Sequence, residues 1–79
     1  MNFLEFMDFF EIRTKNIDAD LKTRLFKLSE FLYSVGEISV SRKKELQGLT
    51  DENKIKSELK GIDHFIQDKI QFFNSLLMR

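Results

Sequence analysis

The sequence predicts an all-α fold, a small antiparallel bundle of three to four helices that is completed by dimerisation. No Pro and only three Gly occur in 79 residues, so few residues interrupt a helix. Apolar side chains recur at helical spacings through most of the chain. The single domain, 1–79, is too short to bury a large core, and the absence of Cys leaves oligomerisation as the usual source of added stability.

The first predicted helix, residues 2–14, is apolar around most of its circumference. Glu5, Asp8 and Lys15 leave only a narrow polar stripe. The apolar side chains are Phe3, Leu4, Phe6, Met7, Phe9, Phe10 and Ile12. We therefore expect this helix to be buried on more than one side.

The second predicted helix covers residues 17–35. Asn16 is expected as its N-cap, and Asp18 falls in the first turn, where a carboxylate complements the helix dipole. Gly36 is well placed to follow the C-cap, a position that often takes a positive φ. The apolar positions, spaced at helical intervals, are Leu21, Leu25, Leu28, Leu32 and Val35. This spacing predicts one continuous packing face.

A short third helix, residues 41–47, is predicted after an extended connection over residues 37–40. Ser39 or Ser41 can cap its start, and Gly48 is expected to end it. The alternative is a single long helix that continues through Gly48, because one Gly weakens a helix without always breaking it.

The last predicted helix, residues 50–78, has Thr50 as its N-cap and Asp51 and Glu52 in its first turn. Its apolar face comprises Ile55, Leu59, Ile62, Ile66, Ile70, Phe73 and Leu77. This period is closer to that of a straight helix than to a strict heptad, which favours a globular bundle over an extended coiled coil. At ~1.5 Å per residue the helix approaches ~40 Å, against ~27 Å for the second helix, so its C-terminal end is expected to project.

Few residues suggest chemistry. His64 is the only His and Cys is absent, so a metal site or a general base has no second group to complete it. A spacing typical of the first half of a calcium loop begins at Asn16, but Leu21 and Lys27 stand where that loop needs Gly and Glu. No catalytic, metal-binding or cofactor-binding residue and no small-molecule substrate is predicted, and we expect a protein that is not an enzyme.

Charge and the first residues indicate the protein's surroundings. With 13 basic and 13 acidic side chains the formal net charge is zero, so we expect no long-range attraction to nucleic acid or anionic lipid. The first residues lack a positive leader, and Glu5, Asp8 and Glu11 interrupt the apolar ones, so neither export nor a membrane span is expected. The absence of Cys suits a reducing compartment, and a cytoplasmic protein is predicted.

Nine Phe residues gather toward the two ends of the chain, more than a monomer of 79 residues can easily bury. One interpretation is that the first and last helices pack together. The other is an apolar patch for a second copy or for a partner's amphipathic helix. The predicted contact residues are Phe3, Phe6, Phe10, Phe65, Phe72, Phe73, Leu76 and Leu77, with Arg42, Lys43 and Lys44 as a charged rim.

The predicted function is that of a non-enzymatic protein-interaction module, a small cytoplasmic regulator, adaptor or chaperone that forms a homodimer or binds another protein. The alternative is DNA binding through residues 31–47, where a Gly separates two helical segments and the second segment carries Arg42, Lys43 and Lys44. This outline is loosely similar to a helix-turn-helix. The zero net charge and the brevity of the second segment count against DNA binding.

The segment 58–73 resembles the dimerisation helix of mercury-resistance-type transcription regulators in its Ile62-Asp63 and Lys69-Ile70 steps followed by aromatic residues. Residues 33–38 resemble the start of that family's DNA-binding half. The resemblance covers about a third of the chain, and the family's recognition region has no counterpart between the two segments. It implies antiparallel, helix-mediated dimerisation and does not assign the chain to the family.

Overall fold

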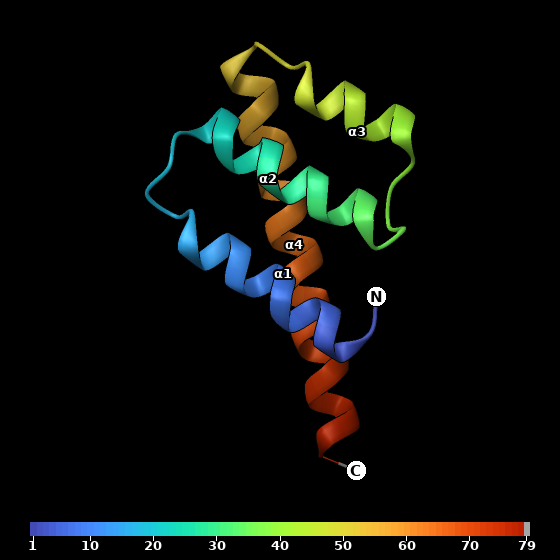
Figure 1. Cartoon of the computed structure of the whole chain (residues 1–79). Helices are drawn as coiled ribbons and strands as arrows, with labels where there is room; N and C mark the ends of the chain where they lie inside the picture. Colours follow the sequence, from blue (N-terminus) through green and yellow to red (C-terminus); the bar gives the residue numbers. More distant parts are fainter. Residues whose placement is uncertain (79) are drawn as a thin grey trace.

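A computed structural model of the chain describes residues 1–78, which form four helices and no strand. The helices are α1 (Phe3–Lys15), α2 (Leu21–Ser34), α3 (Val40–Gln47) and α4 (Glu52–Leu77). Successive helices α1, α2 and α3 run in alternating directions, and α4 passes behind them along the length of the molecule (Figure 1). The small all-α bundle predicted from the sequence is confirmed, and α3 and α4 are separate helices.

The connection between α1 and α2 differs from the prediction. Asn16 does not begin the second helix but closes α1, where its side-chain amide donates to the carbonyl oxygen of Ile12 at 2.7 Å. The chain turns over residues 17–19, and Asp20 is the N-cap of α2, its carboxylate accepting from the backbone N–H of Thr23 at 2.8 Å. Helix α2 therefore starts four residues later than predicted, because two residues of suitable type compete as caps and only Asp20 lies where the chain re-enters the bundle.

The turn after α2 is the one predicted. Gly36 has a φ of 79°, and the backbone N–H groups of Gly36 and Glu37 donate to the carbonyl oxygens of Tyr33 and Leu32. These two bonds define a Schellman motif, which satisfies carbonyl groups that the helix end leaves free. Ser39 caps α3 by accepting from the N–H of Arg42, so Val40 belongs to the helix and not to the extended connection that the sequence predicted.

The N-cap of α4 also lies one residue from the predicted position. Asp51, not Thr50, is the N-cap, and its carboxylate accepts from the backbone N–H of Asn53 at 2.9 Å. A carboxylate is favoured at this position because it also interacts with the positive end of the helix dipole. Helix α4 is 26 residues long, and its C-terminal end extends beyond the other helices, as predicted (Figure 1).

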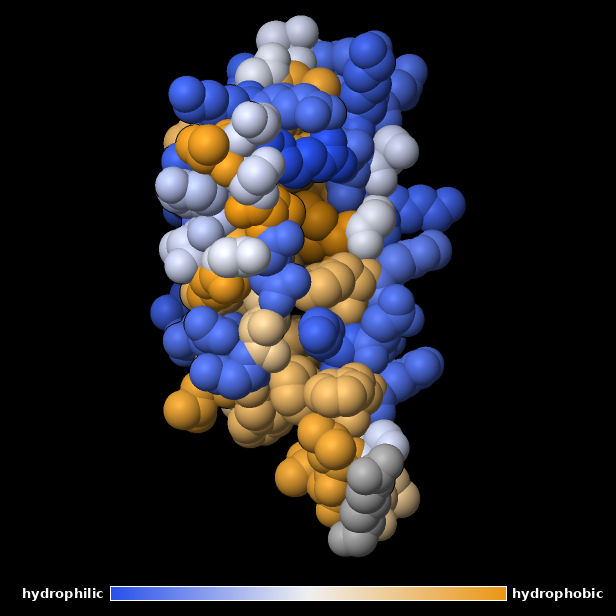
Figure 2. Space-filling model, turned by 90° about the vertical axis from the view of Figure 1, so that its right-hand side faces the viewer, coloured by the Kyte–Doolittle hydropathy of each residue, from blue (hydrophilic) through white to orange (hydrophobic). Residues whose placement is uncertain are grey.

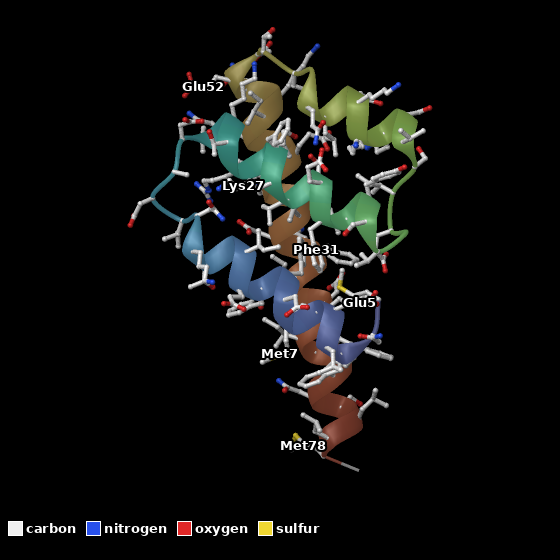
Figure 3. All side chains as sticks on the ribbon, in the orientation of Figure 1. Glu5, Met7, Lys27, Phe31, Glu52 and Met78 are labelled. Carbon is white, nitrogen blue, oxygen red and sulfur yellow. The ribbon has the colours of Figure 1, made fainter. Side chains whose placement is uncertain are left out.

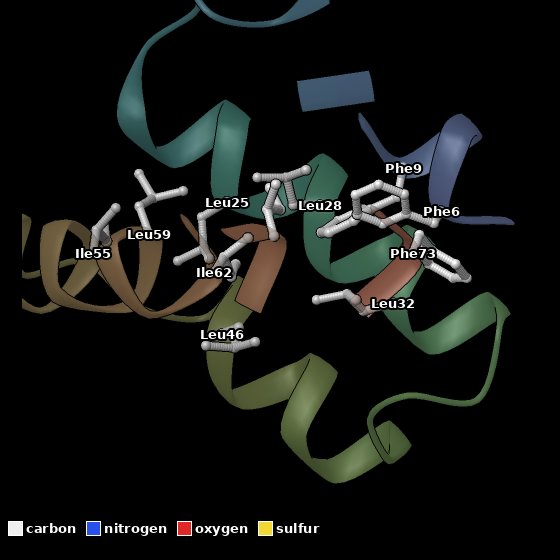
Figure 4. Close-up of a cluster of buried hydrophobic side chains, with 11 residues drawn as sticks. Phe6, Phe9, Leu25, Leu28, Leu32, Leu46, Ile55, Leu59, Ile62 and Phe73 are labelled. Atoms are coloured by element: carbon white, nitrogen blue, oxygen red, sulfur yellow. The ribbon is translucent and has the colours of Figure 1, made fainter. Parts of the chain in front are cut away.

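A single apolar core joins the four helices. It contains Phe6, Phe9, Leu25, Leu28, Leu32, Leu46, Ile55, Leu59, Ile62, Ile66 and Phe73. Figure 4 shows Phe6, Phe9 and Phe73 gathered at one end of this core and Ile55, Leu59 and Leu25 at the other. In the predicted apolar face of α4, the residues from Ile55 to Phe73 lie in the core or pack against it, whereas Leu77 is 73% exposed. The apolar period of that helix is thus confirmed as far as Phe73.

Candidate interaction surface

Helix α1 buries only one of its apolar sides within the chain. Phe6 and Phe9 are its two fully buried residues, whereas Phe3, Met7 and Phe10 keep 40–52% of their surface exposed. The expectation that α1 is buried on more than one side is therefore not met by residues 1–78 alone. A contiguous apolar helix face is rarely left exposed on a folded monomer, so it marks a candidate binding surface.

The exposed side of α1 is continuous with the projecting end of α4. Together they form what we call the tip surface: Phe3, Leu4, Met7, Phe10, Phe72, Leu76, Leu77 and Met78. Figure 2 shows apolar side chains gathered at this lower end of the molecule, whereas the upper end is mostly hydrophilic. Figure 3 places Met7 at the lower edge of α1 and Met78 near the tip of α4.

Aromatic contacts hold the two halves of the tip surface together. The buried ring of Phe73 lies 5.3 Å from that of Phe3 and 5.4 Å from that of Phe6, measured between ring centroids. On its other side, Phe73 meets the exposed ring of Phe72 edge to face at 5.2 Å. Such pairs add to the stabilisation that burial provides, so the contacts with Phe73 restrain the rings of Phe3 and Phe72.

A shallow groove of about 270 Å³ runs between α1 and α4 within the tip surface. Its lining consists of Phe3, Phe6, Met7, Phe10, Ile70, Phe73, Asn74 and Leu77. Asn74 supplies the only polar side chain of this lining. The groove can therefore accept apolar side chains, and its one amide can fix their register by a hydrogen bond.

The structure separates the eight predicted contact residues into three groups. Five of them are exposed on the tip surface: Phe3, Phe10, Phe72, Leu76 and Leu77. Phe6 and Phe73 are only 5% and 8% exposed, and they support the surface from beneath. Phe65 is half-buried near the middle of α4, where its ring packs edge to face against that of Phe9, with the ring centroids 6.1 Å apart.

Three residues of the tip surface are not among the contact residues predicted from the sequence: Leu4, Met7 and Met78. Leu4 and Met7 are three residues apart on α1, a spacing that places them on one helical face. That spacing does not distinguish an exposed face from a buried one, because the seven apolar residues of α1 lie around most of its circumference.

The predicted charged rim does not border the tip surface, because α3 lies at the other end of the molecule from the C-terminal end of α4 (Figure 1). Arg42 bonds to Glu45 at 2.7 Å and also to Glu58 on α4. Lys43 lies 3.4 Å from Glu30 and 4.4 Å from the centre of the Tyr33 ring. These residues attach α3 to its neighbours.

Lys44 differs from the two preceding basic residues. It is exposed and, among residues 1–78, has no carboxylate partner within ion-pair distance.

On the neighbouring α2, the pKa of Glu30 is lowered, chiefly by the hydrogen bond from the Gln47 side chain and also by the charge of Lys43. The polar groups of α3 thus mainly serve its attachment to α2.

A second groove of about 270 Å³ lies between α2, α3 and α4 and was not anticipated from the sequence. Leu32, Ile38 and Phe65 line its apolar floor, and Gly61 leaves room because it carries no side chain. The charged groups at its edge already have partners: Arg42 and Glu58 bind each other, and Glu37 binds the amino group of Met1 at 2.7 Å.

His64 and the spacing that begins at Asn16 are the features of the sequence considered for metal binding. Among residues 1–78, no group of three or more His, Asp or Glu side chains is placed to hold a metal ion. His64 is exposed on α4, and Asp20, from the spacing that begins like a calcium loop, caps α2. Within residues 1–78, no helix combines the length and the apolar character needed to cross a bilayer.

Comparisons of the chain with protein-family models, with curated proteins and with solved structures found no match. The local resemblance of residues 58–73 to a regulator dimerisation helix is therefore not accompanied by a match to a family model. The tip surface is the feature from which a function can be argued.

Proposed function

We propose that this chain is a non-enzymatic protein-interaction module that binds through the tip surface, acting in the cytoplasm as a small regulator, adaptor or chaperone. The observation that carries the proposal is the combined exposure of α1 and the α4 end. Eight of the twelve most exposed large apolar side chains in residues 1–78 belong to this surface, and the other four, at Ile17, Phe26, Tyr33 and Val40, are scattered. A contiguous apolar patch is typical of a binding surface, whereas single exposed apolar residues are ordinary.

The binding mode that fits this surface is helix packing. An apolar groove between two helices accepts side chains that recur every three or four residues on a partner helix. The rings of Phe3 and Phe72, held by Phe73, provide large and rigid contacts that lose little side-chain entropy on binding.

DNA recognition through residues 31–47 has less support. Arg42 and Lys43 contact carboxylates, which partly neutralises the charge that would bind phosphates. Lys44 is the remaining basic residue of that run, and the whole chain has no net charge.

Site-specific photo-cross-linking in the native host tests the proposed function. A photoreactive phenylalanine analogue would replace Phe72 in the tip surface or, as the control, Phe26 on α2, since the two side chains are 53% and 46% exposed. We expect discrete cross-linked products from position 72 and none of comparable yield from position 26. Equal yields from the two positions, or no product from position 72, would contradict the proposal.

A further inference from the structure

The projecting end of α4 carries two apolar ridges that face different directions. Phe73 and Leu77 form one ridge, which borders α1: Phe73 is buried against Phe3, and Leu77 lines the groove but remains 73% exposed. Phe72 and Leu76, also four residues apart, form the neighbouring ridge, and they remain 53% and 46% exposed. Only Phe73 of these four residues is buried within the chain, and about half of the surface of Phe72 and of Leu76 remains exposed.

The ridge of Phe72 and Leu76 and the groove lie on neighbouring faces of the tip surface, so one molecule presents both. A two-fold symmetric interface needs such a combination, because each copy must present both the protruding and the receiving elements. We infer that the partner of the tip surface is a second copy of this chain. The two α4 ends lie antiparallel, and Phe72 and Leu76 of each copy enter the groove of the other. This inference rests on the proposed function and names the partner of the same surface.

The exposed area is sufficient for such a dimer. If a fully exposed side chain of this size presents ~200 Å², the eight exposed fractions of the tip surface amount to ~900 Å² per copy. A stable interface of ordinary size covers ~800 Å² on each partner, so the dimer must cover most of the tip surface.

The charge pattern is also compatible with self-association. Residues 70–78 contain no charged side chain, and Gln71, Asn74 and Ser75 supply the polar positions of the projecting end. A two-fold axis brings identical residues close together, so any charge near the axis would face a like charge and weaken the dimer. Residues 70–78 add no such repulsion.

Solution mass tests the inference directly. Light scattering of the full chain over a dilution series is expected to give twice 9.4 kDa at high concentration. The double variant Phe72→Glu with Leu76→Glu is expected to stay monomeric over the same series while keeping its helical circular dichroism. The matched control, Phe26→Glu, is expected to remain a dimer, since Phe26 is exposed to a similar extent on α2 and is not part of the tip surface.

Single Cys variants keep the test decisive if the Glu variants fail to fold. The chain has no Cys of its own, so Leu76→Cys and Phe26→Cys each introduce one thiol, at positions that are both 46% exposed. A short thiol-specific cross-linker is expected to join two copies of the Leu76→Cys variant and not two copies of the Phe26→Cys variant. Comparable cross-linking of the two variants would overturn the inference.

The two proposals can fail separately. A monomeric wild-type protein, or a dimer that the Glu substitutions do not dissociate, would overturn the self-association inference. If position 72 nevertheless cross-links to a different polypeptide in the host, the proposed function stands with another partner. If position 72 gives no product at all, both proposals are wrong.

Discussion

Phenylalanine side chains take two roles in this protein, and their helical positions decide which. Phe9 is fully buried, with its ring stacked on that of Phe31 at 5.7 Å and edge to face with that of Phe65. Phe72 is next to the buried Phe73 in sequence, yet more than half of its side chain is exposed. A rotation of about 100° per residue is enough to move a ring from the core to the surface.

Substitutions at buried and at exposed positions should differ in how far they lower the free energy of unfolding. Phe9→Ala is expected to lower the free energy of unfolding by ~3–5 kcal/mol, because it leaves a cavity at a fully buried site, and Ile66→Val by ~0.5–1.5 kcal/mol. Phe26→Ala should cost about 1 kcal/mol or less, since nearly half of that side chain is exposed. Urea denaturation followed by circular dichroism measures all three. A loss for Phe9→Ala no larger than that for Phe26→Ala would contradict the core described here.

Two glycines should respond to the same substitution with opposite signs. Gly36→Ala is expected to cost about 1 kcal/mol, because its φ of 79° strains a residue with a Cβ although no atom lies within 4 Å of it. Gly61→Ala, in the interior of α4 with similarly open surroundings, is expected to gain ~0.5–1 kcal/mol from helix propensity. Thermal melts of the two variants beside the wild type check the signs, and a stabilised Gly36→Ala would rule out the left-handed turn.

Cap residues, and not apolar spacing, determine where the helices of this protein begin. Asp20 and Asp51 cap α2 and α4, whereas Asn16 and Thr50, also suitable by residue type, do not. The short helix α3 has Leu46 as its one fully buried residue. Its attachment therefore depends more on polar contacts than that of the other helices.

The cap of α2 makes the stability of that helix depend on pH. The pKa of Asp20 is below its ordinary value of 3.8, chiefly because the backbone N–H of Thr23 donates to the carboxylate and next because the Thr23 hydroxyl does. A lowered pKa stabilises the fold fully above the ordinary value, and this stabilisation is lost as the pH falls through the lowered value. The charged form of Asp20 is thus the one that favours α2.

Asp20→Asn tests this dependence, because Asn keeps a side-chain acceptor for the cap but does not titrate. The wild-type urea midpoint should exceed that of the Asn variant at neutral pH, and the difference should shrink as the pH falls below 3.8. A difference that stays constant between about pH 5 and about pH 2 would show that the charge of Asp20 does not stabilise the helix.

The whole molecule combines a balanced charge with an uneven distribution of apolar surface. Thirteen basic and thirteen acidic side chains cancel, while the exposed apolar residues gather at one end of a molecule that measures 44 × 25 × 18 Å. Long-range electrostatic attraction is therefore weak, and the proposed association is expected to depend on short-range apolar contact.

Binding to duplex DNA tests the expected effect of the balanced charge. We expect no mobility shift of duplex DNA by the wild-type protein at physiological salt, because no net positive charge is available to displace counterions. A triple variant, with Arg42, Lys43 and Lys44 all changed to Ala, serves as the control. A salt-dependent shift by the wild type that disappears in this variant would instead support the helix-turn-helix alternative.

The sequence by itself determined the helical class, the turn at Gly36 and the projecting end of α4, and it left open whether the chain has three helices or four. Each of these depends on local rules: apolar spacing, the lack of Pro, the freedom of Gly at positive φ, and rise per residue. These rules hold whatever the helices pack against, so they can be applied to one chain without its neighbours.

Only the tertiary structure decided which cap starts each helix and which apolar side chains remain exposed. Spacing shows that Phe72 and Leu76 share a face, as Phe73 and Leu77 do, but not which face meets α1. In the same way, it does not show that Arg42 would reach Glu58 and leave the tip surface without a basic rim. Contacts between residues distant in sequence settle both, since burial depends on the relative placement of whole helices and not on the residues of one.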